Sequence, residues 1–287
     1  MGNHDEETWA SGAWNDAKLG SLQADIFRGA GVTVPRGVCV RLGDNHELAC
    51  CFNPDTLTYD AVWKGGFLKF SSVRHGFLDG LLMDGKAVPF SEKGKRVQAS
   101  EGNDDFEYEG FHRCGDRIGF AYRIGKTRYV DMPWVANGQF VRNVIVVPFT
   151  APVSSVRQWP ETFETAIRHG SGSPYAVDTI EMPTDNSWNV PLFGGGLGFL
   201  EDGSALVCTM HGDVWRITGF AYPSKKATWT RFASGLHHCQ GMVVDSRGIF
   251  VLGRGQITRL HDTDHDGEAD FYECFSPDYS PMLGDES

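Results

Sequence analysis

One acidic segment, from Asp262 to Glu273, has the residue types and the spacing of a calcium-binding loop. Calcium takes about six to eight oxygen ligands, which such a loop presents at alternating positions. Six residues would provide these ligands: Asp262, Asp264, Asp266, Glu268, Asp270 and Glu273. Glu268 would use its backbone carbonyl and Glu273 both carboxylate oxygens, whereas Asp270 would bind directly or through water. Gly267 would supply the turn, because glycine adopts a positive φ at little cost.

The sequence on either side of this segment predicts strands and not the two helices of an EF-hand. Residues 255–260 alternate and include β-branched side chains, as strands do. Pro277 follows soon after the segment and prevents a long exiting helix. We therefore expect a structural calcium clamp between two strands. The alternative is an acidic surface loop that stays solvated and binds no metal.

The composition favours an all-β protein without a nucleic-acid partner. The 35 Gly, 13 Pro and 19 Phe residues favour strands joined by tight turns. The chain has 26 Lys and Arg against 37 Asp and Glu, a net charge of -11, and its basic residues are scattered, which argues against nucleic-acid binding. No apolar run is long enough to predict a membrane span, and the polar, acidic start of the sequence does not predict a signal peptide.

The seven cysteines show no C-x-x-C spacing. They therefore predict neither a zinc ribbon, nor a redox pair, nor a covalent haem site. Most are expected to be small buried hydrophobic residues. Cys50 and Cys51 are adjacent, so on a strand they would face opposite sides and at most one would face the core.

Strand-like runs in the first half of the chain predict a β-sandwich-like domain. They lie at 38–42, 47–52, 58–63, 118–124, 128–132 and 140–147. A short helix is expected at 161–168, because Pro160 suits a helix start. The Gly- and Ser-rich segment 170–174 is typical of a linker. These features divide the chain into a poorly defined segment (1–35), a β-rich auxiliary domain (36–170) and a second domain (171–287).

The second domain contains a repeat. Residues 196–217 and 241–260 share a succession of strand, turn, strand, glycine turn and strand. Their offset of roughly 43 to 45 residues matches one four-stranded blade of a β-propeller. A closed propeller needs about four to eight blades, whereas this domain has room for about two. We therefore expect the first blades of an incomplete β-propeller, either in a fragment of a longer protein or with the open edge covered by a partner.

Short motifs give the chain a family resemblance. In the second domain they are Trp188-Asn189, Phe193-Gly194-Gly195, Gly203, Cys208 to Trp215, Gly235-Leu236, Gly241-Met242 and Gln256 to Leu260. Together they resemble the opening blades of the glucose/sorbosone dehydrogenase-like propeller of large secreted planctomycete proteins. Motifs of the first domain resemble the uncharacterised β-rich domain that precedes that propeller, and they are Arg36-Gly37-Val38, Cys51 to Leu57 and Trp63 to Leu68.

The resemblance implies the N-terminal part of a periplasmic or extracellular, quinoprotein-like sugar or alcohol dehydrogenase. Pyrroloquinoline quinone (PQQ) would act only in the complete protein, and a cytochrome c module would accept the electrons. The C-x-x-C-H haem motif and the signal peptide of the full proteins do not occur in this sequence, so haem is not expected in this chain. The resemblance carries over no catalytic and no cofactor-binding residue. Gly198 stands where an acidic residue is expected, and the base histidine of related propellers belongs to a later blade.

Two pairs of charged or titratable residues have a functional and a structural interpretation. His237 and His238 could supply a general base, because histidine titrates near neutrality. As blade-turn residues they would instead bond to the backbone, and this interpretation is favoured. Arg216 and Arg259 could clamp a cofactor carboxylate, but arginines that cover a strand face are the favoured interpretation.

Large aromatic residues in the first domain raise a second function. Trp63, Phe67, Trp134 and Phe140 could stack on a sugar, although core packing is the commoner use of such residues. The alternative to the dehydrogenase interpretation is therefore a non-enzymatic β module that binds a carbohydrate or a partner protein.

Overall fold

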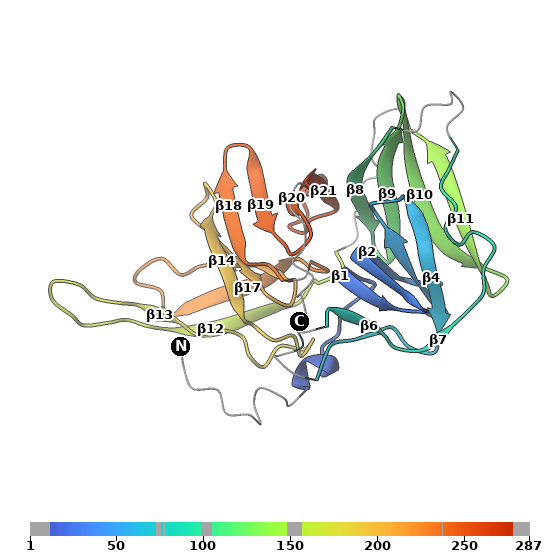
Figure 1. Ribbon diagram of the computed structural model, residues 1–287. Coiled ribbons are helices and arrows are strands. Elements are labelled where there is room, and N and C mark those ends of the chain that lie inside the picture. Colours follow the sequence, from blue (N-terminus) through green and yellow to red (C-terminus); the bar gives the residue numbers. More distant parts are fainter. Residues whose placement is uncertain are drawn as a thin grey trace, which may run out of the picture.

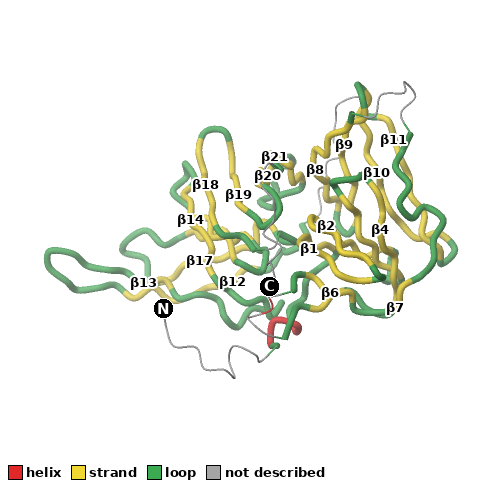
Figure 2. The backbone as a smooth tube through the Cα atoms, viewed as in Figure 1, coloured by secondary structure: helices red, strands yellow, loops and turns green. Residues whose placement is uncertain are grey.

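The computed structural model describes residues 12–72, 76, 79–98, 105–147, 157–236 and 238–277. It confirms the all-β fold (Figure 1, Figure 2). The structure describes a short 3-10 helix, η1 (Ala13–Asp16), and strands that form three sheets. No helix in the described part of the chain has the length and apolar character that crossing a membrane requires.

Hydrogen bonding between neighbouring strands fixes the strand order of the three sheets. The first consists of β5 (Leu68–Lys69), β6 (Leu81–Met83), β1 (Leu22–Gly29), β2 (Val32–Leu42), β3 (Leu48–Asn53), β4 (Thr58–Lys64) and β7 (Lys86–Ala87). The second consists of β11 (Gln139–Val146), β10 (Thr127–Ala136), β9 (Arg117–Ile124), β8 (Phe106–Cys114), β21 (Phe271–Ser276), β20 (Ile257–His261), β19 (Gly248–Leu252) and β18 (Gly241–Asp245). The third consists of β13 (Thr179–Ile180), β12 (Thr162–Arg168), β17 (Lys226–Ala233), β16 (Val214–Thr218), β15 (Ala205–Thr209) and β14 (Gly194–Phe199).

The first sheet packs on β8, β9 and β10 of the second sheet as a β-sandwich (Figure 1). Their inner faces share one hydrophobic core, at whose centre Phe52 of β3 stacks on Phe120 of β9 with ring centroids 4.0 Å apart. The six strands expected in the first half of the chain all coincide with observed strands. They were predictable because apolar residues alternate along them and turn residues separate them.

Strand β3 is covered on both of its faces. Cys50 lies in the sandwich core, whereas Cys51 lies in a second core together with Trp63 and Phe67. The expectation that at most one of the two thiols faces a core is therefore wrong, because the first sheet buries both sides. Burial raises the pKa of both thiols, so they are held in their neutral form.

The predicted repeat corresponds to two antiparallel four-stranded meanders, each with the strand succession of a propeller blade. We call β14–β17 the first meander and β18–β21 the second meander. Their first strands, β14 and β18, lie side by side (Figure 1). Glycines permit this approach: a Cβ on Gly196 would lie 2.7 Å from the backbone nitrogen of Met242, and a Cβ on Gly198 would lie 2.5 Å from Cγ2 of Val244.

The second meander is continuous with the sandwich, because β21 pairs with β8. Phe271 is opposite His112, and Glu273 is opposite Gly110. The structure thus differs from the expected division at residue 170, since strands from both sides of it share one sheet. Segment 170–174 lies in the loop of the β12–β13 hairpin and does not link domains. Strand β1 and the start of β2 lie within 1–35, so the last part of that segment contributes strands to the first sheet.

The helix expected at 161–168 is wrong, because these residues form strand β12. It pairs with β17, with Phe163 opposite Trp229. The apolar residues Phe163 and Ile167 are four positions apart, a spacing that puts them on one face of either a helix or a strand. Pairing with β17 decides between the two, and a single sequence does not show that pairing.

Candidate metal centre

Residues 262–270 of the acidic segment form the loop between β20 and β21, and its last three residues begin β21. The strand on each side of the loop was predicted, and it distinguishes the site from an EF-hand. The loop faces Arg113 at the end of β8 and Gln158 before β12, with which it lines a recess of about 20 Å³. That volume holds about one water-sized sphere. The recess is thus of a size that suits a single ion.

Three of the predicted ligands are brought together. Asp262, Asp264 and Asp270 each offer a carboxylate oxygen, and these oxygens lie within 4.8 Å of one another. Oδ2 of Asp264 is buried and has no hydrogen-bond partner among the described residues. A buried carboxylate oxygen without a donor is costly unless a cation compensates it. The donor set, carboxylate oxygens without nitrogen or sulfur, suits a hard cation such as Ca²⁺.

Backbone groups of the loop hold the carboxylates in place. The N–H of Asp266 donates to Oδ1 of Asp262 at 3.1 Å, and the N–H of Gly267 donates to Oδ2 of Asp262 at 3.0 Å. The hydroxyl of Thr263 donates to the carboxylate of Asp270 at 2.8 Å. Gly267 has a φ of 92°, as expected for the turn, and His265 also has a positive φ, 61°. The sequence pattern did not identify Thr263, which contacts the predicted ligand Asp270 and is not one of the six predicted ligands.

The electrostatics of the loop favour an added positive charge. Burial raises the pKa of Asp262, and the negative charges of Asp266, Asp264 and Asp270 raise it further, while the N–H of Gly267 opposes the shift. Burial also raises the pKa of Asp270. Arg113 is the one cationic side chain among the described residues that line the same recess. A divalent cation would remove the repulsion among the remaining carboxylates.

Asp266 and Glu268 use their side chains within the protein. Oδ1 of Asp266 accepts from the N–H of Glu268 at 2.8 Å. The carboxylate of Glu268 accepts from the N–H groups of Gln158 and Trp159, at 2.8 and 2.7 Å, and forms an ion pair with Arg157 at 3.4 Å. The side chain of Glu268 is thus tied to the segment before β12. Its predicted contribution through the backbone carbonyl is compatible with this arrangement and stays a prediction.

Glu273 lies away from the cluster. Strand β21 begins at Phe271, and Glu273 lies opposite Arg259 of β20, with its Oε2 2.6 Å from Nε2 of His261. In an EF-hand the final glutamate returns to the ion because it lies on a helix. Here the chain continues in an extended strand, so the structure does not bring Glu273 to the other five predicted ligands.

The histidine and arginine candidates occupy structural positions. His238 is buried, and its ring Nδ1 lies 3.2 Å from Nη1 of Arg254. The backbone N–H of His238 donates to the carbonyl of Met210. Arg216 forms an ion pair with Asp202 in the turn between β14 and β15. Arg259 donates to the backbone oxygen of Arg247 and lies 3.6 Å from Glu273. His237 lies outside the described residues.

The four aromatic candidates do not form one platform. Trp63 and Phe67 are buried in the second core. Trp134 lies under the guanidinium of Arg117, and Phe140 packs edge-on against Tyr59. Each of the four aromatic side chains thus packs against other side chains in the described part of the chain.

Comparison with known proteins identifies part of the sandwich. A family model described as "Domain of unknown function (DUF6797)" matches residues 50–131. This range runs from β3 into β10 and thus includes strands from both sheets of the sandwich, but neither meander and not the acidic loop. No curated protein matches the chain. The chain is thus similar to this family over one part of its sandwich.

Proposed function

We propose that the chain is a calcium-stabilised β module with a supporting role in a periplasmic or extracellular propeller-type oxidoreductase. In this proposal the acidic loop binds Ca²⁺ and fixes the joint between the two meanders and the sandwich. The quinone chemistry and the contact with a cytochrome c module belong to other parts of such a protein. The observation that carries the metal assignment is the convergence of Asp262, Asp264 and Asp270, with the unpaired buried oxygen of Asp264.

The joint is the structural reason for a metal at this place. Loop 262–270 connects β20 to β21, and β21 pairs with β8 of the sandwich. The backbone N–H of Arg113, on β8, donates to the carbonyl of Asp270 at 2.7 Å, and the N–H of Ala269 donates to the carbonyl of Phe232 on β17. The loop thus contacts the sandwich and both meanders. An ion that orders the loop would stabilise all three contacts.

The packing of the two meanders supports the propeller-type architecture. In the first meander, Gly198, Leu206 and Val214 face the second meander, and both apolar side chains are fully buried. The repeat position equivalent to Gly198 is Val243 of β18, which is 55% exposed. Leu252, which lies diagonally across from it on the adjacent strand β19, is exposed as well. The outer face of the second meander thus corresponds to the covered face of the first. We propose that a further sheet of the same repeat covers it.

Calorimetric titration with Ca²⁺ tests the metal assignment. We expect one site in the intact chain and none in the Asp262→Ala, Asp266→Ala double variant. A matched control is the Asp202→Ala, Asp245→Ala double variant, which removes the same charge from two other turns. At a free Ca²⁺ concentration of about one hundred times Kd, the free energy of unfolding should rise by about 2.7 kcal/mol. Absence of binding to the intact, folded chain would overturn the proposal.

A further inference from the structure

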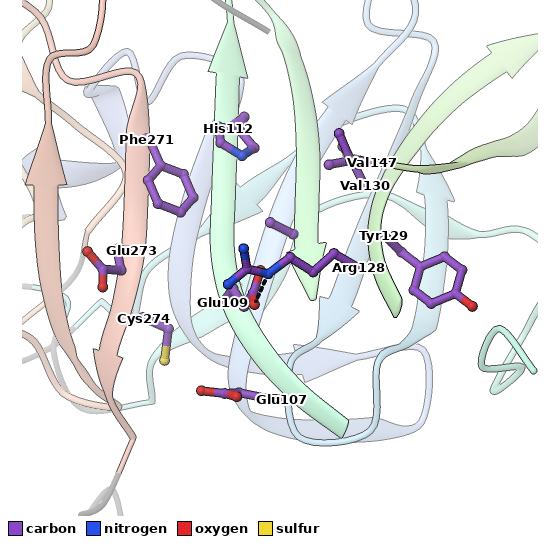
Figure 3. A pocket seen from close by; sticks show the side chains of 11 residues that line it. Glu107, Glu109, His112, Arg128, Tyr129, Val130, Val147, Phe271, Glu273 and Cys274 are labelled. Atoms are coloured by element: carbon purple, nitrogen blue, oxygen red, sulfur yellow. Dashed lines mark hydrogen bonds and ion pairs between the residues drawn. The ribbon is translucent and has the colours of Figure 1, made fainter. Parts of the chain in front are cut away.

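A second cavity lies on the outer face of the eight-stranded sheet, away from the sandwich core. It has a volume of about 410 Å³ and crosses β21, β8, β9 and β10 (Figure 3). Small-molecule sites have volumes of about 300 to 1,000 Å³. The side chains that give it its chemistry are Glu107, Glu109, His112, Arg128, Phe271 and Glu273. The cavity is thus large enough for a small ligand and combines charged with aromatic groups.

The hollow exists because two small residues meet at its centre. Gly110 of β8 is paired with Ala121 of β9, so neither strand raises a large side chain there. Gly110 also pairs with Glu273 of β21, and its φ of 131° belongs to a bulge in β8. A Cβ at Gly110 would lie 2.1 Å from the carbonyl oxygen of Tyr272, so this position requires glycine. The depression is therefore built into the register of the three strands.

Each carboxylate of the cavity has a cationic neighbour. Glu109 accepts from Nε of Arg128 at 2.8 Å, a contact visible in Figure 3. Glu107 accepts from Arg123 at 2.6 Å, and Glu273 lies 3.6 Å from Arg259. Each of the three carboxylates is thus paired with a guanidinium group, which offsets its negative charge; of these arginines, Arg128 belongs to the cavity wall, whereas Arg123 and Arg259 pair with their glutamates from beside it. A carboxylate has about four acceptor positions, so one ion pair leaves acceptors for a ligand.

A stacked pair of rings lies at one end of the cavity. The ring of Phe271 stacks on His112 with centroids 4.3 Å apart and planes 19° apart. Figure 3 shows both rings at the same end of the cavity. Burial and the nearby His261 lower the pKa of His112 to about 4, so the stacked pair is uncharged near neutral pH. An uncharged ring face packs well on C–H groups.

We propose that this cavity binds a neutral polyhydroxylated ligand, a mono- or disaccharide. Hydroxyl groups both donate and accept, so they match carboxylates that lie beside guanidinium groups. The C–H groups of a sugar ring match the uncharged aromatic pair of Phe271 and His112. The site goes beyond the proposed calcium function, which places no ligand on this face.

Saturation-transfer NMR and calorimetry on the intact chain, with and without added Ca²⁺, test this site. The probes are glucose, galactose, cellobiose and maltose, with glucosamine and glucose 6-phosphate as charged counterparts. We expect at least one neutral sugar to bind. Ala121→Leu, which fills the centre of the hollow, should weaken that binding by about tenfold or more, equivalent to about 1.4 kcal/mol.

A second variant addresses the polar side of the cavity. Glu109→Gln keeps the size of the side chain but removes its charge, and it should weaken sugar binding by about three- to tenfold. The matched control is Glu164→Gln, because Glu164 forms a similar ion pair with Lys226 on another sheet. That variant should leave the affinity unchanged. If Ala121→Leu does not fold, Glu109→Gln against this control decides the question.

Three outcomes would overturn the proposal. The first is that none of the four neutral sugars binds to the intact, folded chain. The second is that a sugar binds equally well to the Ala121→Leu and Glu109→Gln variants, which would place it elsewhere. The third is a preference of more than tenfold for glucosamine or glucose 6-phosphate over glucose, which would mean that charge dominates recognition. Each result is independent of whether the acidic loop binds Ca²⁺.

Discussion

The backbone N–H of Trp159 donates to Oε1 of Glu268 at 2.7 Å and so connects the segment before β12 with the acidic loop. The same tryptophan covers the buried guanidinium of Arg231, at 4.0 Å, and its indole N–H donates to Ser234 at 3.1 Å. One residue thus contacts both the candidate metal loop and the core of the first meander. We therefore expect order in the loop and the stability of that meander to be coupled.

Glu268 is expected to stabilise this joint through its carboxylate. Glu268→Ala leaves the N–H groups of Gln158 and Trp159 without their acceptor, so it should lower the free energy of unfolding by about 1 to 3 kcal/mol. Glu268→Gln retains one acceptor oxygen and should cost less. Urea denaturation in the absence of Ca²⁺ measures both changes. Equal stability of the alanine variant and the natural chain would contradict this role.

Asp213 and Arg231 form a buried ion pair. Replacing either residue alone should lower the free energy of unfolding. Each side chain is 2% exposed, and Nε of Arg231 donates to Oδ1 of Asp213 at 2.8 Å. Arg231→Met or Asp213→Leu alone would leave an uncompensated buried charge, with an expected loss of about 3 to 5 kcal/mol. The double variant should lose less than the sum of the two. A double-mutant cycle by chemical denaturation measures the coupling, and additive losses would show that the pair does not act as a unit.

The strands were predictable from sequence where their neighbours in space are also their neighbours in sequence. The second meander follows from local alternation and glycine turns, because each of its strands pairs with the next one along the chain. The pairing of β21 with β8 was not predictable. It joins Phe271 to His112, far apart in the sequence, and no local pattern encodes such a contact.

The candidate site was predictable in part, for the same reason. The positions of Asp262, Asp264 and Gly267 depend on a short loop, and the spacing of the motif captures that loop. The placement of Glu273 depends on the strand that follows, which turns its side chain toward His261. The role of Glu268 depends on Trp159, more than a hundred positions earlier in the sequence, so the loop alone could not reveal it.

Asp25 should make the stability of the chain depend on pH. Burial raises its pKa to about 6 from 3.8, against the opposing charges of Arg254 and His238. Because the folded-state pKa lies above the unfolded one, the folded chain binds the proton more tightly. The resulting stability is fully present below about pH 4 and is lost as the pH rises through about 6. The contribution of Asp25 to the free energy of unfolding thus differs between low and high pH by on the order of 3 kcal/mol.

The comparison of Asp25→Asn with the natural chain isolates this effect. The free energy of unfolding of the natural chain, relative to that of the variant, should fall between about pH 4 and 6. Above about pH 6 the difference between the two should be constant. Denaturation at several pH values measures the difference, and repetition at high salt should preserve it, because a buried group is screened little. A difference that does not change with pH would contradict the raised pKa of Asp25.

Gly196 should be required for the close packing of the two meanders. A Cβ at this position would lie 2.7 Å from the backbone nitrogen of Met242 and 2.8 Å from the backbone carbon of Gly241, and backbone atoms cannot move aside as a flexible side chain can. Gly196→Ala should therefore lower the free energy of unfolding by about 1 to 3 kcal/mol, as overpacking does.

Gly194→Ala is the matched control in the same strand, because its Cβ would meet nothing closer than Val207 at 4.0 Å. The control should be neutral or stabilising by up to about 1 kcal/mol, since alanine restricts the unfolded chain. Thermal denaturation compares the two variants, and amide exchange in β14 and β18 shows whether the meanders separate. Equal stability of the two variants would mean that the meanders pack less closely than the structure shows.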